Sequence, residues 1–365
     1  MPSGARIFDV YSSEHLRARA VVGMSADSCV VTFDSYHENL SLGRPGFEQG
    51  FLRKSRMDAV HVVSAGNTGY QYADLPELCS KVSELTKAYR RVVAYGSSMG
   101  GYAAIRYGGW AGAHVALAIS PQFTLDPRRR PFDKRWVNDL NGVRFIHEER
   151  RDAVRQAVVI YDSESKIDSA HVALLHGLTT VDAIPLPDSG HPSAGFLNDL
   201  GLFHQIVLDV CAGEFDPKKL MTEAGRRCQE SAQFRHTRAL RPRNLRSRYR
   251  LLVEAARLGP THAPTLQDLA KTAIKVGLPQ VALEALGKVD DTPAALHLRS
   301  LAYAKTGQLP RAIEILESLC QAHPGWSICS TDLRRLKRWQ WLEGPRSWLR
   351  HARSLMTGSA NRQNP

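Results

Sequence analysis

The stretch Arg90–Gly108, RRVVAYGSSMGGYAAIRYG, constrains the fold more than any other part of the chain. Residues 91–95 are apolar and β-branched, which favours a buried strand, whereas residues 101–107 are rich in helix formers. Between them a glycine-rich corner begins at Gly96 and fits G-x-S-x-G, with Ser98 at its centre. A serine on so sharp a turn has a strained backbone, and neighbours without a Cβ let strand and helix pack closely. The pattern therefore predicts that the Ser98 hydroxyl is presented above the edge of a sheet.

Further apolar runs predict the rest of that sheet. Residues 5–23 indicate a hairpin, apolar residues at helical spacing predict a helix over 75–89, and the expected strands are 28–34, 58–65, 91–95, 114–120, 156–162 and 180–186. Strands that alternate with helices imply a mostly parallel sheet with helices on both faces. Active sites in such sheets lie beyond the carboxyl ends of the strands. The residues that follow each strand are therefore the candidates for function.

Two of the predicted strands are followed by residues that suit acid–base chemistry. His191 lies in the glycine-flanked loop PDSGHPSAG after the last strand. Asp162 ends the strand before it, and Glu164 and Asp168 follow in one expected loop. A serine hydroxyl is a poor nucleophile near neutral pH, so it needs a base to take its proton and a carboxylate to orient that base. Ser98, His191 and one of these acids would form such a set.

With these residues the chain resembles the α/β-hydrolase superfamily, whose nucleophile elbow has the G-x-S-x-G shape and whose triad follows the order serine, acid, histidine. The resemblance implies that Ser98 is the nucleophile and His191 the base. Asp162 is preferred as the acid because it stands at the end of a strand and at a typical distance before His191. Asp168 and Glu164 are the alternatives.

The same resemblance implies an oxyanion hole formed by two backbone N–H groups. One belongs to Met99, and the other to Ser35 or Tyr36 in the loop after the first parallel strand. His37 lies in that loop and Ser97 precedes the nucleophile, so both are expected to contact substrate. No cofactor and no metal ion is expected, because the histidines lack the spacing that holds zinc.

Residues 121–155 form an insertion where the superfamily often carries a cap over the pocket. The insertion contains the run Arg128-Arg129-Arg130 between two prolines. Arginines above the pocket would select an anionic or sugar-bearing substrate, and the alternative is a solvated charged loop. A short cap offers little apolar surface for a long acyl chain. These features predict a small acyl ester of a saccharide or metabolite as the substrate.

Composition sets limits on the class of protein. A length of 365 residues suggests two domains, and 43% hydrophobic with 23% charged residues excludes disorder as the general state. The six cysteines lack C-x-x-C spacing, which favours free thiols in a reducing compartment over a disulfide framework. Because no apolar run has the length of a signal peptide or a membrane span, we expect a cytoplasmic protein.

Much of the net charge of +12 lies after residue 215. The segment 216–250 is rich in arginine, and Pro242 interrupts its helical periodicity, so a basic linker is expected. Nucleic-acid binding by this segment is the more specific alternative to a basic linker. It is disfavoured because the segment lacks interleaved aromatic residues and a known binding module.

From about Leu251 the composition becomes helical and two stretches superpose. Glycine, alanine and leucine recur with one internal spacing, at Gly277, Ala282 and Leu286 and again at Gly307, Ala312 and Leu316. This resembles the tetratricopeptide repeat (TPR), in which small residues let paired helices pack closely, and it implies a groove for a protein partner. The alternative is a plain helical bundle. A third helical pair is expected over 331–356, with Trp339, Trp341 and Trp348.

The sequence thus predicts an α/β-hydrolase domain over 1–215, a basic linker over 216–250 and an all-α, TPR-like domain over 251–365. The first function hypothesis is a serine hydrolase that cleaves an ester or thioester through an acyl-enzyme on Ser98. An acyltransferase would use the same triad, and a hydrolase-fold adaptor without turnover is the alternative from another class. The corner itself also fits a glycine-rich turn without chemistry, or a phosphate-binding loop, although a dinucleotide site is marked by G-x-G-x-x-G.

Overall fold

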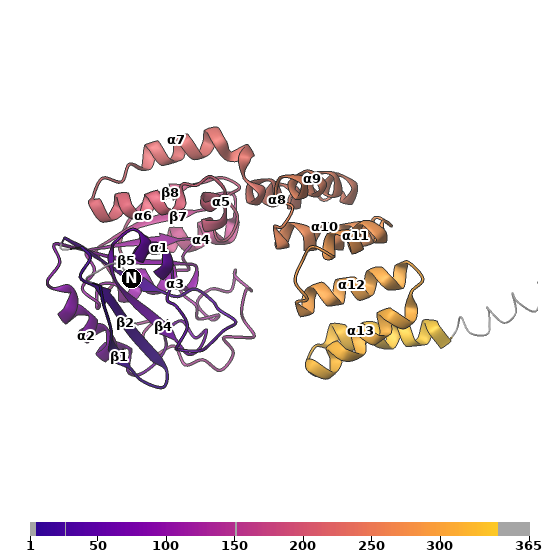
Figure 1. Ribbon diagram of the computed structural model, residues 1–365, viewed down its shortest axis with the longest axis horizontal. Helices are drawn as coiled ribbons and strands as arrows, with labels where there is room; N and C mark the ends of the chain where they lie inside the picture. Colours follow the sequence, from indigo (N-terminus) through magenta and orange to yellow (C-terminus); the bar gives the residue numbers. More distant parts are fainter. Residues whose placement is uncertain (1–4, 26, 150–151, 342–365) are drawn as a thin grey trace, which may run out of the picture. The chain divides into compact units, whose positions relative to one another are not determined.

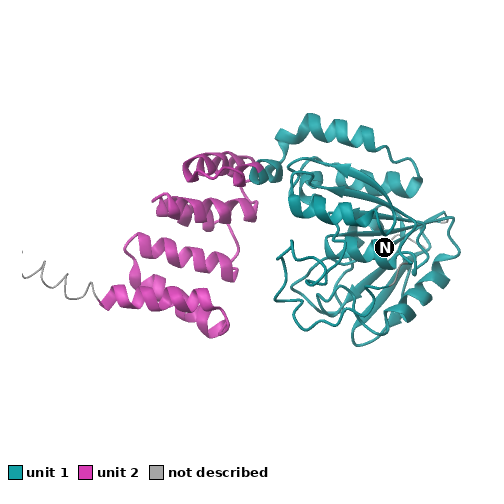
Figure 2. Cartoon of the chain, turned by 180° about the vertical axis from the view of Figure 1, so that it is seen from behind, with its two compact units in different colours: residues 1–237 teal, residues 238–365 magenta. Residues whose placement is uncertain are grey.

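The computed structural model describes residues 5–25, 27–149 and 152–341, which form two compact units (Figure 2). The division falls between Thr237 and Arg238. The first unit is built on one eight-stranded sheet, and the described part of the second unit consists of helices.

The sheet is mostly parallel. Its strands are β1 (Arg6–Ser12), β2 (Leu16–Val22), β3 (Ser28–Phe33), β4 (Asp58–Ser64), β5 (Arg91–Ser97), β6 (Val115–Ile119), β7 (Gln156–Tyr161) and β8 (Thr180–Pro185), in the order β1-β2-β4-β3-β5-β6-β7-β8. β2 runs antiparallel to both of its neighbours, and all other neighbouring strands are parallel. The chain therefore has the expected α/β-hydrolase fold, and each predicted strand is present. Figure 1 shows the sheet with its covering helices.

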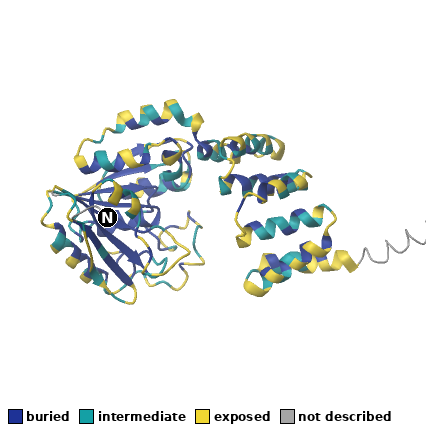
Figure 3. Cartoon of the chain, viewed as in Figure 1, coloured by how far each residue is buried: buried dark blue, intermediate teal, exposed yellow. Residues whose placement is uncertain are grey.

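Helices cover both faces of the sheet and enclose two cores. On one face α2 (Leu75–Thr86), α3 (Met99–Tyr107) and α4 (Lys166–Leu175) pack on the strands; on the other lie α1 (Gln49–Lys54), α5 (Ala194–Asp199) and α6 (Phe203–Ala212). Because both faces are covered, the central strands are mostly apolar and are buried, as Figure 3 shows. No helix among the described residues is long and apolar enough to cross a membrane.

The prediction of a basic linker over 216–250 is wrong, because these residues are largely helical. They form α7 (Pro217–Arg227), a short 3₁₀ turn (Cys228–Glu230), α8 (Ala232–Leu240) and the first part of α9 (Leu245–Leu258). The Asp216 side chain caps α7, and Leu220 and Ala224 are buried in the core on the second face of the sheet. The proline interrupts only the turn before α9, so the first unit extends well beyond residue 215.

The helical unit contains an internal repeat of helix pairs. The helices of this repeat are α10 (Ala263–Lys275), α11 (Pro279–Leu286), α12 (Pro293–Lys305) and α13 (Leu309–Ala322). Each first helix ends before a left-handed glycine, Gly277 with φ 85° and Gly307 with φ 83°, and each second helix has proline in its first turn. The two pairs are offset by 30 residues, shorter than the roughly 34 of a TPR, whose identification here stays a prediction.

The expected third helical pair is described only in part. Residues 327–341 are helical, and Trp339 and Trp341 lie on the surface of that helix. Trp348 and the rest of the expected pair lie outside the described residues.

Candidate active site

Ser98 stands on the corner between β5 and α3, as expected. Its backbone angles are φ 52° and ψ −117°, a region that residues with a side chain rarely adopt. Hydrogen bonds on both sides hold this conformation, from Ser98 N–H to Ile119 O (2.8 Å) and from Tyr102 N–H to Ser98 O (2.9 Å). The hydroxyl is therefore fixed at the carboxyl end of β5.

The glycines around Ser98 are required by close packing. A Cβ at Gly96 would lie 2.3 Å from the backbone carbonyl of Gly100, and a Cβ at Gly100 would lie 2.3 Å from the carbonyl oxygen of Phe33. Both distances are far below van der Waals contact, and the obstructing atoms belong to the backbone. Glycine at these two positions therefore lets α3 begin directly against the ends of β5 and β3.

Ser98 and His191 lie together although 93 positions separate them, with 3.1 Å between Ser98 Oγ and His191 Nε2. The other ring nitrogen, Nδ1, is 3.1 Å from Oδ2 of Asp168. Since a carboxylate only accepts hydrogen bonds, Nδ1 carries the proton and Nε2 is left to accept the Ser98 hydroxyl. This is the protonation that a general base for serine needs.

The carboxylate that contacts His191 belongs to Asp168 and not to Asp162, which the sequence pattern favours. The Asp162 carboxylate accepts the backbone N–H groups of Glu164 (2.9 Å), Asp188 (2.9 Å) and Gly190 (3.0 Å). With its oxygens occupied in this way, it holds the turn that leads into His191. The third candidate, Glu164, has an exposed side chain.

Asp168 lies in the first turn of α4, where a loop was expected. Ser165 caps this helix by accepting the Asp168 N–H, at 3.2 Å. Ser-x-x-Asp before an apolar stretch is a capping signal, and it would have located the helix start. Asp168 is buried. Its Oδ2 faces His191, and its other oxygen, Oδ1, lies 3.3 Å from Arg135 Nη1.

The groups expected to form the oxyanion hole lie beside the elbow. Met99 is the first residue of α3, and helix geometry leaves its N–H without a partner inside the helix. The loop after β3 is tied to β5 by the Ser35 hydroxyl, which donates to Ser97 O at 2.9 Å. The following residue, Tyr36, lines the pocket at Ser98. Their roles as oxyanion donors stay predictions.

His37 and Ser97 were expected to contact substrate. His37 instead shapes its own loop, since its N–H donates to Asn67 Oδ1 (3.0 Å) and its Nδ1 accepts the Asn39 N–H (3.0 Å). Ser97 is 3% exposed. Among the described residues, neither lines the pocket at Ser98, whereas Asn67 does.

The pocket is small, because its walls leave only about 10 Å³ for the centre of a water molecule. It is lined by Tyr36, Asn67, Ser98, Met99, Gln122, Leu125, Trp136 and Leu140. Four of these residues come from the segment 121–155, which carries turns but no helix or strand among its described residues. The Trp136 ring centre lies 6.0 Å from that of His191 and 6.4 Å from that of Tyr36. The segment therefore supplies one wall of the pocket.

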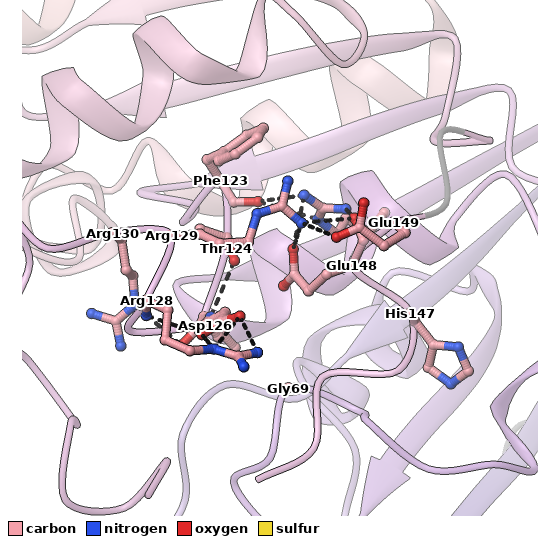
Figure 4. Close-up of polar contacts among 12 residues, drawn as sticks. Gly69, Phe123, Thr124, Asp126, Arg128, Arg129, Arg130, His147, Glu148 and Glu149 are labelled. Carbon is pink, nitrogen blue, oxygen red and sulfur yellow. Dashed lines mark hydrogen bonds and ion pairs between the residues drawn. The ribbon is translucent and has the colours of Figure 1, made fainter.

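The arginine run of this segment is paired with carboxylates and is not among the residues that line the pocket. Arg128 lies 2.7 Å from Asp126, and Arg129 lies 3.3 Å from Glu149 and 3.6 Å from Glu148 (Figure 4). Arg130 is fully buried, 3.3 Å from Asp133. The expected selection of an anionic substrate by this run is therefore not supported.

Buried polar contacts anchor the segment to α3, the helix that follows Ser98. Arg106 of α3 lies 3.1 Å from Glu148 Oε2, and the Tyr102 hydroxyl donates to Glu148 Oε1 at 2.8 Å. Burial raises the pKa of Tyr102 well above its usual value, so it stays a neutral donor. These contacts fix the wall of the pocket relative to Ser98.

A second buried cluster lies next to Asp168 and is linked to it through Arg135. Phe123 N–H donates to His171 Nδ1 (3.1 Å), so Nε2 carries the proton and donates to Asp133 (3.0 Å). Burial lowers the pKa of His171. Burial raises the pKa of Asp133, but hydrogen bonds from His171 and Arg135 outweigh it and hold the pKa below its usual range. Asp133 is therefore charged, and Arg135 bridges it to Asp168.

Gln122 is a residue that the sequence patterns did not indicate. It follows β6, the strand next to the one that carries Ser98, and its Nε2 lies 3.1 Å from Ser98 Oγ. Its position just after a parallel strand was the available signal, because that is where such sheets place their functional side chains.

No protein-family model and no curated protein matches the chain. Among solved structures it is similar to Est1E from Butyrivibrio proteoclasticus, with 13% identity, 57% of this chain and 98% of that chain covered, and a TM-score of 0.37. A serine hydrolase from Xanthomonas campestris, described as lacking a lid, has 18% identity, coverage of 62% and 96%, and a TM-score of 0.32. A dienelactone hydrolase from Anabaena variabilis has 15% identity, coverage of 51% and 87%, and a TM-score of 0.33. What this chain acts on has to be inferred from its own residues.

Proposed function

We propose that the chain is a serine hydrolase that cleaves an ester or thioester through an acyl-enzyme on Ser98. The observation that carries the proposal is the line of contacts from Ser98 Oγ to His191 Nε2 and from His191 Nδ1 to Asp168. A nucleophile, a base and an orienting acid in hydrogen-bond contact form the recurring arrangement for acyl transfer. The strained backbone of Ser98 supports the same role, since such strain gathers at functional sites.

The reaction proceeds in two halves. His191 Nε2 takes the hydroxyl proton as Ser98 Oγ attacks the carbonyl carbon, and the oxyanion is held by N–H groups of Met99 and of Ser35 or Tyr36. Each such donor contributes about 3 kcal/mol to the transition state. His191 then gives the proton to the departing oxygen or sulfur. A water molecule, activated by the same nitrogen, releases the acid and restores the serine.

The pocket favours a short acyl group. Its walls are close together, and the aromatic ring of Trp136 and the side chains of Leu125 and Leu140 limit its length. A small acyl ester of a metabolite or saccharide therefore remains the proposed substrate. An acyl acceptor other than water would turn the same intermediate into an acyl transfer.

The test is labelling with a fluorophosphonate, followed by turnover of 4-nitrophenyl esters of increasing chain length. Wild-type protein should be labelled and should prefer short esters, and Ser98→Ala should neither react nor turn over. A protein that is only an adaptor would leave both variants unlabelled and inactive.

The partner role expected of the helical unit also stays a prediction. What supports it is an open groove along α11, α12 and α13, lined by Leu296, Tyr303, Arg311 and Ile315 among others.

A further inference from the structure

Gln122 has one half of its side-chain amide in use and the other half without a partner. The residue is 1% exposed, and its Nε2 lies 3.1 Å from Ser98 Oγ. Its Oε1 is buried and has no hydrogen-bond partner among the described residues. An orphaned buried acceptor costs about 1–3 kcal/mol, so a bound group that satisfies it is favoured.

The hydrogen positions in the site decide which end of the Gln122 amide bonds Ser98. His191 Nδ1 donates to Asp168, so Nε2 accepts the single hydroxyl hydrogen of Ser98. The Gln122 amide must then donate to Ser98 Oγ, which it does through Nε2. The Oε1 atom is left as an acceptor beside the nucleophile, in a residue that lines the pocket.

The strand order decides which part of an ester meets this acceptor. One expected oxyanion donor, Met99, follows β5 itself, and the other, Ser35 or Tyr36, follows β3 on one side of β5, whereas Gln122 follows β6 on the other side. In the tetrahedral intermediate one oxygen points to those donors, and the departing oxygen must face His191 to receive its proton. The remaining substituent is the acyl chain, and the side left for it is that of Gln122.

We propose that Gln122 selects acyl groups that carry a hydroxyl on the carbon next to the carbonyl, which makes 2-hydroxyacyl esters the preferred substrates. This inference rests on the proposed esterase function. Such a hydroxyl is three covalent bonds from Ser98 Oγ in the intermediate, close enough to donate to Gln122 Oε1. A neutral hydroxyl suits the site better than an ammonium group, because the residues that line the pocket include no carboxylate.

The test compares three 4-nitrophenyl esters: hydroxyacetate, propionate, which has an acyl group of the same size, and methoxyacetate, whose acyl group is one methyl larger. Methoxyacetate matches the electron withdrawal of hydroxyacetate but has no proton to donate. Wild-type protein should hydrolyse hydroxyacetate with a kcat/KM about tenfold above that for methoxyacetate, the usual effect of one hydrogen bond to a buried acceptor. Gln122→Met keeps the size and removes the acceptor, so the ratio should fall to about one.

Two further variants keep the result interpretable. Gln122→Glu retains an acceptor and should keep the preference for hydroxyacetate even if all three rates fall. Gln205→Met makes the same change on the exposed side of α6 and should leave the ratio as in wild type.

A wild-type ratio near one would overturn the inference, and so would an unchanged ratio in Gln122→Met, which would show a purely structural role. In both cases Ser98-dependent hydrolysis of the esters would leave the proposed esterase function standing. Rates in wild type no higher than in Ser98→Ala would refute the esterase function, and the inference with it.

Discussion

Two buried aspartates, six positions apart, have different surroundings and therefore different expected roles. Asp168 offers one oxygen to His191 and the other to Arg135. The oxygens of Asp162 accept backbone N–H groups from the turns around it. A carboxylate in contact with the base acts on the reaction, whereas one that holds backbone acts on the local fold.

Asp168→Asn should lower kcat by a factor on the order of 10³–10⁴ while the protein keeps its melting temperature. The amide nitrogen of asparagine donates a hydrogen bond and cannot accept the proton of His191 Nδ1. The imidazole would then carry its proton on Nε2, which could no longer take the proton of Ser98. Steady-state kinetics on a short ester, together with thermal melting, measures both quantities.

Asp162→Asn is the matched change. An amide nitrogen cannot accept the N–H groups that the carboxylate accepts now, so this variant should lose stability, and its folded fraction should retain most of the activity. If instead Asp162→Asn is stable and inactive while Asp168→Asn is active, the assignment of the acid is wrong.

The residues of the site differ in how far the sequence reveals them. Ser98 lies in a local pattern and His191 in a glycine-flanked loop after a strand, so the amino-acid sequence alone singles out both as candidates. Asp168 depends on where α4 begins, which the adjacent Asp162 at the strand end obscures. Gln122 has no local pattern at all. Its role depends on β6 lying beside β5, a property of the whole sheet.

At the scale of elements, the elbow is limited by backbone contact. Gly100→Ala would place a Cβ 2.3 Å from the Phe33 carbonyl oxygen, and a backbone atom cannot turn aside as a side chain does. The start of α3 must move away from β3, which should cost about 3 kcal/mol of stability and displace the Met99 N–H. Denaturant unfolding and kcat on a short ester check the two effects.

Gly225→Ala in α7 is the control, because nothing lies within 4 Å of its added Cβ. There the same substitution should stabilise the protein by about 0.5–1 kcal/mol, as alanine generally does inside a helix. If Gly100→Ala behaves like Gly225→Ala, the close-packing account of the elbow fails.

The elements that are buried on both sides were the ones predicted best. Continuous apolar runs such as VVAY in β5 leave little choice but an interior strand. The segment of α7 to α9 resembles a linker in its composition, because arginines dominate it and hide the helical pattern of its apolar residues. What makes it helical is a small set of features, the caps at Asp216 and Asn244 and a few buried apolar side chains.

At the scale of the whole molecule, acid should weaken the sheet unit through its buried histidines. Burial lowers the pKa of His61 to about 4, and burial also lowers the pKa of His171. An unfolded chain binds protons at histidine near pH 6.5, so below that value it takes up protons that the folded state refuses. Stability contributed by His61 is full above pH 6.5 and is lost as the pH falls toward 4, by about 3 kcal/mol in total.

Urea unfolding at several values between pH 7 and pH 4 measures this slope. His61→Asn should flatten it, and His176→Asn, at an exposed position, should leave it unchanged. A slope that is the same in all three proteins would contradict the role of the buried ring.

The base of the proposed triad follows β8, and β8 is the last strand at one margin of the sheet, with β7 as its single neighbour. An edge strand opens more readily than a central strand, because it is hydrogen-bonded to a neighbouring strand on one side only. The nucleophile, by contrast, sits on a central strand. The proposed catalysis thus joins a central strand to an edge strand, so activity should be lost when that edge first loosens, before the rest of the sheet unit unfolds.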